Sequence, residues 1–204
     1  MILKPASFVL ASLLTAYPTT ALEESVAILL TDPDLQMSEE LRTMVTDRVS
    51  TNKLLDLQSE YIDIFDRGRS ANPIYETEYG RHRALAKGNE LSDIAGFYHA
   101  FGFELAADRE NMDMLDHASI ELEFYALLLM KQIHLSEVNN DEGVFIVEDG
   151  RKKFMVSHLG RFIAAIGDRP GVQESEYYRS IYGWVADLVE KECKELQLEI
   201  DIVD

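Results

Sequence analysis

Apolar residues recur at the spacing of amphipathic helices along most of the chain. A first helix is predicted from about Pro5 to Tyr17, where Pro18 closes it. A second opens at the capping-box pattern Thr20–Glu23 and runs to about Leu30. Further helices are predicted over residues 38–49, 52–65, 91–101, 115–134, 151–166 and 173–198. The last two place Phe154, His158, Leu159, Phe162 and Ile166, and then Tyr177, Ile181, Trp184, Val185 and Leu188, on inward faces.

Polar segments separate these helices. Residues 66–74 (DRGRSANPI) combine Gly, Ser, Asn and Pro and predict a loop, after which helical character returns near Thr77. Residues 104–115 predict a polar connection. Residues 138–150 (VNNDEGVFIVEDG) favour a loop over a strand, because the run VFIV has no partner run to pair with. The chain is therefore expected to be all-α: one compact domain over residues 1–204, a bundle of about eight or nine helices, with a frayed tail from about 199 to 204.

The helix predicted from Leu115 to His134 has the best-defined start. Asp116 is a good N-cap, because its carboxylate can accept hydrogen bonds from the first-turn N–H groups. An apolar stripe follows at helical spacing, and core packing is the simplest role for its members Ile120, Phe124, Leu127 and Leu128. An apolar helix with Asp-His at its start needs a further explanation.

The net charge of −18 argues against nucleic acids and anionic membrane surfaces as partners and favours a basic peptide or protein surface. Solubility alone is the simpler explanation of the same charge. No apolar stretch reaches the roughly 20 residues that span a bilayer. The N-terminal run resembles a secretory signal, but it leads directly into the next helical pattern and is interpreted as a first core helix. The single cysteine, Cys193, excludes a disulfide within the chain.

Several enzyme classes lack their motifs. The chain has no glycine-rich phosphate loop, no H-E-x-x-H, no Glu-x-x-His and no G-x-S-x-G. His117 and Glu121 lie one helical turn apart and could share a metal ion, although helix capping and surface ion pairs are the simpler interpretation. His158, on an apolar face, is expected to be a satisfied core histidine. The sequence therefore predicts no catalytic residues, no metal site and no bound cofactor.

Four segments together resemble one family, the TorD/DmsD/NarJ-type redox enzyme maturation chaperones, which include the delta subunits of nitrate reductases. Residues 116–124 (DHASIELEF) are similar to the family signature D-H-x-x-x-E-L-E-F. Residues 72–79 (NPIYETEY) resemble its P-x-Y-E/S-x-Y loop, and residues 61–69 (YIDIFDRGR) resemble the Y-V-D-x-F-D-R-G-R segment of the NarJ branch. Residues 13–18 (LLTAYP) resemble the end of the family's first helix.

Two positions depart from the family pattern. Many members have a proline where this chain has Leu115, and some branches have a second proline in the loop that here reads Asn72-Pro73-Ile74. The mixture of NarJ-like and TorD-like features points to a client related to nitrate reductase rather than nitrate reductase itself.

The resemblance implies an all-helical cytoplasmic chaperone without catalysis. Such proteins bind the leader or N-terminal segment of an apo molybdoenzyme catalytic subunit, in some cases a twin-arginine signal peptide. They assist insertion of the molybdenum cofactor and delay export until it is in place. Monomers and dimers are both compatible with a bundle of this type.

We expect the client peptide to bind between the Pro-Tyr loop and the start of the Asp116 helix, where an apolar floor and an acidic rim suit a basic, apolar leader. The residues expected to line this site are Tyr75, Glu76, Tyr79, Asp116, His117 and Glu121. Two alternatives stay open: a small helical metal- or cofactor-binding enzyme using His117, Glu121 and Glu123, and an acidic accessory subunit that remains with its partner permanently.

Overall fold

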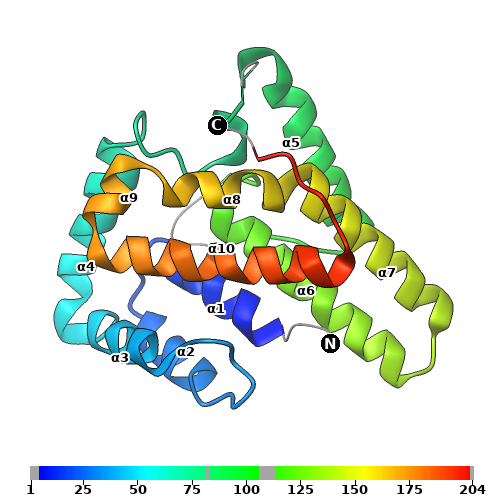
Figure 1. The fold of residues 1–204 in the computed structure, drawn as a ribbon, viewed down its shortest axis with the longest axis horizontal. Helices are drawn as coiled ribbons and strands as arrows, with labels where there is room; N and C mark the ends of the chain where they lie inside the picture. The colour runs from blue at the N-terminus through cyan, green and yellow to red at the C-terminus, as the bar shows by residue number, and fades with distance from the viewer. Residues whose placement is uncertain (1–4, 81–82, 106–113, 203–204) are drawn as a thin grey trace.

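The computed structural model describes residues 5–80, 83–105 and 114–202, and within these residues it is helical with no strand (Figure 1). The first half of the chain contains α1 (Pro5–Thr15), α2 (Leu22–Leu29), α3 (Glu39–Arg48), η1 (Thr51–Lys53), α4 (Leu54–Tyr61), the π-helical turn η2 (Ile62–Arg67) and the 3₁₀ turn η3 (Glu76–Glu78). The second half contains α5 (Arg83–Ala100), α6 (Ala118–Glu137), α7 (Asp141–Phe154), the π-helical turn η4 (Met155–Leu159), α8 (Gly160–Gly167), α9 (Pro170–Glu174) and α10 (Glu176–Leu196). The predicted all-α class is confirmed.

The centre of the bundle is the N-terminal helix. α1 packs between α6 and α10, and α8 packs on α10 (Figure 1). Phe8, Leu10 and Ala11 are completely buried, and the Phe8 ring lies 4.8 Å from the ring of Tyr125 on α6. This burial on several sides of one short helix explains why its sequence is apolar almost throughout. The inward faces predicted for residues 154–166 and for α10 are confirmed, because the side chains named for them are all buried.

Three boundaries differ from the sequence prediction. Residues 138–150 are not a loop: a left-handed turn at Asn139 is followed by α7, whose first turn is capped by the Asn140 side chain bonding to the Gly143 N–H. The Thr20 capping box does not form, because Glu23 accepts hydrogen bonds from Thr51 instead. The helix predicted at 91–101 begins earlier, as α5 runs continuously from Arg83.

The C-terminal tail crosses back over the bundle after α10. Gln197 adopts a left-handed conformation that ends the helix, and the chain then passes along η4 and α8 toward α5 (Figure 1). Ile200 packs directly over Gly160. A Cβ added to Gly160 would lie 2.3 Å from the Cδ1 atom of Ile200. The tail is thus packed as far as Ile200, whereas frayed ends had been expected from residue 199; residues 203 and 204 lie outside the described residues.

None of the helices in the described ranges combines the length and apolarity that crossing a membrane requires.

Candidate functional site

The segment that resembles the Pro-Tyr loop is bonded directly to the start of α6. The Glu76 N–H donates to the Asp116 carbonyl at 2.8 Å, and the Ala118 N–H donates to the Ile74 carbonyl at 3.1 Å, so Tyr75 and His117 face each other as an isolated antiparallel bridge. Two segments far apart in sequence are therefore held together by main-chain bonds.

His117, rather than Asp116, is the N-cap of α6. Its Nδ1 accepts from the Ser119 N–H at 3.1 Å, and its Nε2 lies 3.1 Å from the Tyr61 hydroxyl. Because Nδ1 acts as an acceptor, the neutral ring carries its proton on Nε2 and donates it to Tyr61. The capping role predicted for Asp116 was wrong by one residue.

Asp116 is fully buried and bonds across the junction instead. Its Oδ2 accepts from the Thr77 hydroxyl at 2.5 Å and from the Thr77 N–H at 3.2 Å. The carboxylate is drawn away from the helix by these two donors, which leaves the first turn of α6 to His117. The Asp-His pair thus performs two different tasks, one across the loop and one along the helix.

Aromatic contacts tie the other motif segments to this junction. The Tyr17 and Tyr61 rings meet edge to face at 5.5 Å, and the Tyr75 ring meets the His117 ring at 5.1 Å. The Arg69 guanidinium lies 4.3 Å from the centre of the Tyr75 ring. All four segments that resembled the family motifs therefore converge on one place.

Asn72 and Gly68 fix how the loop leaves η2. The Asn72 amide donates to the carbonyls of Ile64 and Gly68, and its oxygen accepts from the Gly171 N–H at 2.7 Å. A Cβ added to Gly68 would lie only 2.5 Å from the Ile64 carbonyl oxygen, so this close approach requires glycine.

A chain of polar side chains leads outward from the junction to the surface. Glu76 is buried and bonds to His158 Nδ1 at 2.9 Å, and His158 Nε2 lies 3.1 Å from Asp93 of α5. Burial by itself lowers the pKa of His158, but its bonds to Glu76 and Asp93 outweigh that effect, and the net pKa is raised. A buried histidine between two carboxylates is a satisfied core histidine, as expected, although it also reaches the surface.

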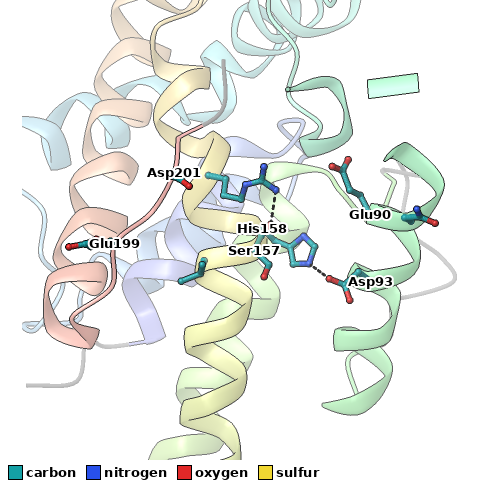
Figure 2. Close-up of a pocket in the computed structure, with 9 residues that line it drawn as sticks. Glu90, Asp93, Ser157, His158, Glu199 and Asp201 are labelled. Carbon is teal, nitrogen blue, oxygen red and sulfur yellow. Dashed lines mark hydrogen bonds and ion pairs between the residues drawn. The ribbon is translucent and has the colours of Figure 1, made fainter. Parts of the chain in front are cut away.

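An open pocket of about 620 Å³ lies above this chain. Its side chains come from four segments, α5, η4, the start of α8 and the C-terminal tail (Figure 2). Four carboxylates line it, together with one arginine, Arg161. The carboxylates belong to Glu90, Asp93, Glu199 and Asp201. Burial and the charge of Glu76 raise the pKa of Glu90, as a strongly negative environment requires.

A second, more apolar groove adjoins this pocket, because Asp93 lines both. The groove has a volume of about 300 Å³ and lies between α5 and α7, where Phe97, Phe101 and Ile146 contribute apolar surface. Phe101 approaches α7 closely at Gly150, since a Cβ there would lie 2.3 Å from its ring. An acidic pocket and an apolar groove therefore form one continuous surface along α5.

The structure brings the six residues predicted to bind a peptide together, but mostly below the surface. Only Tyr75 is partly exposed, while the other five are buried. Tyr79 donates to the Pro73 carbonyl at 2.6 Å and lies beneath the Arg169 guanidinium. These buried residues can support a surface site, whereas the acidic pocket residues could not be recognised from the sequence. The one available signal was the spacing of Glu90 and Asp93 on one face of a helix.

The metal-site alternative gains no support from this geometry. Both ring nitrogens of His117 already bond to Tyr61 and Ser119. Across the described ranges no group of three or more His, Cys, Asp or Glu side chains is arranged to hold a metal ion.

Comparison with known protein families shows which family the chain belongs to. The sequence model of the family described as nitrate reductase delta subunit matches residues 30–166, more than half of the chain. The chain belongs to that family. The resemblance carried by the motifs is thereby confirmed. The delta-subunit match includes η2, the loop at 72–80, α5, α6, α7 and η4, which build the junction and the apolar groove, whereas the acidic pocket also takes Glu199 and Asp201 from the tail outside the match. A search of curated proteins finds no significant match.

Proposed function

We propose that this chain is a maturation chaperone for the catalytic subunit of a molybdoenzyme related to nitrate reductase. It binds the N-terminal segment of the apo subunit along α5. The basic residues of that segment enter the acidic pocket, and its apolar residues occupy the groove beside α7. The proposal rests on the family membership, and the observation that carries the binding mode is the acidic pocket joined to an apolar groove through Asp93.

The charges of the pocket favour a basic ligand. Four carboxylates and a single arginine, Arg161, line the pocket, and His158 is already paired with Glu76 and Asp93. Lysine or arginine side chains entering this pocket would gain charge-assisted hydrogen bonds. The overall charge of −18 adds long-range attraction for the same ligand, which raises the association rate at low salt.

The apolar groove suits a helical ligand. Phe97 and Ile146 line it, Ile146 is 53% exposed, and Phe145, the preceding residue of α7, is 73% exposed. Such exposed apolar surface beside a groove is typical of a site that receives the apolar face of a short helix. A leader that pairs a basic start with an apolar helical run is complementary to both halves of the surface.

The six residues predicted from the sequence retain a part in this proposal. Tyr75, held by Arg69, offers ring surface that a peptide can contact directly. The five buried residues act by positioning: Glu76 holds His158 at the floor of the acidic pocket, and the Asp116–Thr77 bonds hold Glu76 in turn.

We further propose that the chain acts in the cytoplasm, without catalysis. It would keep the client open until the molybdenum cofactor is inserted, delay export until then, and leave the mature enzyme. A twin-arginine leader would fit the acidic pocket. The alternative, a permanent acidic subunit, differs in one respect: it would co-purify with the cofactor-loaded enzyme.

Calorimetry with a synthetic peptide tests the binding mode. The peptide is the N-terminal segment of a nitrate-reductase-like molybdoenzyme catalytic subunit from the same organism. The double variant Glu90→Gln, Glu199→Gln removes two pocket charges, and each exposed contact contributes about 0.5 kcal/mol, so we expect binding weaker by roughly three- to tenfold at low salt. The matched control Glu40→Gln, Glu176→Gln removes the same charge beside α3 and α10. If both double variants bind the peptide equally weakly, the overall negative charge and not the acidic pocket attracts it, which would refute the binding mode. If the wild type does not bind the peptide, the whole proposal is refuted.

A further inference from the structure

Glu121 is a buried carboxyl group without a donor. Its side chain is 0% exposed, and among the described residues neither of its oxygens accepts a hydrogen bond and no ion pair reaches it. An ionised carboxylate in that position would be strongly disfavoured, because burying a charge without a partner is costly. The protein must therefore meet the requirement of this group in another way.

The neighbour of Glu121 is a second carboxyl group. Glu76, also buried, lies within hydrogen-bonding reach of it, and Asp116 adds a further negative charge nearby. Two carboxylates cannot bond to each other unless one carries a proton, since an ionised carboxylate only accepts. Burial first, and then the charges of Glu76 and Asp116, raise the pKa of Glu121 well above the ordinary glutamate value.

The titratable groups near this pair come from several segments. η3 supplies Glu76, Asp116 precedes α6, η4 supplies His158, and α5 supplies Glu90, Asp93 and Tyr98. Tyr98 donates its proton to the Leu115 carbonyl at 2.8 Å, and His158 is paired on both sides. A proton on Glu121 is what completes the series of hydrogen bonds that runs from α6 through Glu76 to His158.

We propose that Glu121 and Glu76 share a proton that locks the Glu76–Glu78 turn onto α6 and η4 at neutral pH and releases the turn when it is lost. The proton leaves to solvent, and the two carboxylates then repel each other in the interior. This proton-dependent lock goes beyond the proposed function and does not depend on whether the chain binds a leader.

The sign of the pH dependence follows from the binding of the proton. The folded protein binds this proton more tightly than the unfolded chain, whose glutamate titrates near 4.5. The stabilisation is therefore fully present below pH 4.5 and is lost as pH rises through the folded pKa of Glu121. Over that range the folded-to-unfolded ratio falls by up to about tenfold for each pH unit.

Denaturant unfolding from pH 4.5 to 9 tests the lock. Glu121→Gln has nearly the same shape, is always neutral and can still donate to Glu76, so we expect it to fold and to lose this part of the pH dependence. Glu137→Gln, at an exposed position on the same helix, removes the same charge and is expected to follow the wild type. Parallel stability profiles for the wild type and Glu121→Gln would overturn the proposal.

Infrared spectroscopy gives a second, independent reading. The wild type should show the C=O stretch of a protonated carboxyl group at neutral pH, and this band should be absent from Glu121→Gln. The band should persist while stability falls with rising pH, and it should disappear only near the folded pKa of Glu121, where the fall in stability levels off. If the wild type shows no such band at neutral pH, the proposal is overturned even if the Gln variant fails to fold.

Discussion

The bond between Thr77 and Asp116 offers the sharpest test of how the junction is held. Thr77→Val keeps the shape of the side chain and removes only its hydroxyl group. That hydroxyl donates to Asp116 Oδ2 at 2.5 Å, and both residues are buried. A hydrogen bond to a charged group contributes about 1.5–3 kcal/mol to stability, so we expect Thr77→Val to lower the free energy of unfolding by about 2 kcal/mol.

Removing the other partner should cost more. Asp116→Ala leaves both the Thr77 hydroxyl and the Thr77 N–H without an acceptor, and we expect a loss of roughly 3–5 kcal/mol. The two changes affect one interaction, so the double variant should be less destabilised than the sum of the single variants. The expected coupling energy is about 1.5–3 kcal/mol.

Urea unfolding of the four proteins measures these quantities. The midpoint should shift while the dependence on urea concentration stays the same, because the surface exposed on unfolding does not change. If Asp116 served mainly as the cap of α6, Asp116→Ala would cost about 1 kcal/mol and Thr77→Val almost nothing. A coupling energy below about 0.5 kcal/mol would therefore refute the assignment of Asp116 to the loop rather than to the helix.

Two further changes test other parts of the fold. Gly68→Ala should lower the free energy of unfolding by about 1–3 kcal/mol, because its Cβ would press against the Ile64 carbonyl. An unchanged free energy of unfolding, or a crystal structure in which η2 has shifted to make room, would contradict the requirement for glycine. Glu192→Gln leaves Arg151 buried without its charged partner and should cost about 3–5 kcal/mol in thermal or urea unfolding. The surface variant Glu148→Gln, which removes a comparable ion pair on α7, should change stability by less than about 1 kcal/mol; similar losses in both would contradict the role of burial.

Helical spacing was sufficient to predict the elements whose apolar faces are buried by several neighbours. α1 and α10 are examples, because each packs against more than one helix and its sequence is patterned accordingly. α7 was missed since its first turn reads as a polar turn and because two of its apolar residues, Phe145 and Ile146, remain exposed. The cap supplied by Asn140 and the packing of α7 on α6 outweigh the loop-like composition.

The candidate site was predictable only in part. The motifs singled out residues 72–79 and the start of α6 as parts of one site. Which of their side chains turn inward depends on contacts that sequence spacing does not contain. The Asp116 carboxylate does not cap α6, because Thr77, which is distant in sequence, supplies two hydrogen-bond donors to it. The acidic pocket is assembled from α5, η4, α8 and the tail, so no single segment carries its pattern.

We propose above all that this chain prepares a molybdoenzyme catalytic subunit for its cofactor. The decisive measurement is the molybdenum cofactor content of that catalytic subunit, purified from cells with and without this chain. We predict that the subunit made without the chain is poor in cofactor, that supplying the chain restores it, and that the chain is absent from the loaded enzyme. A subunit that is fully loaded without the chain would contradict the account.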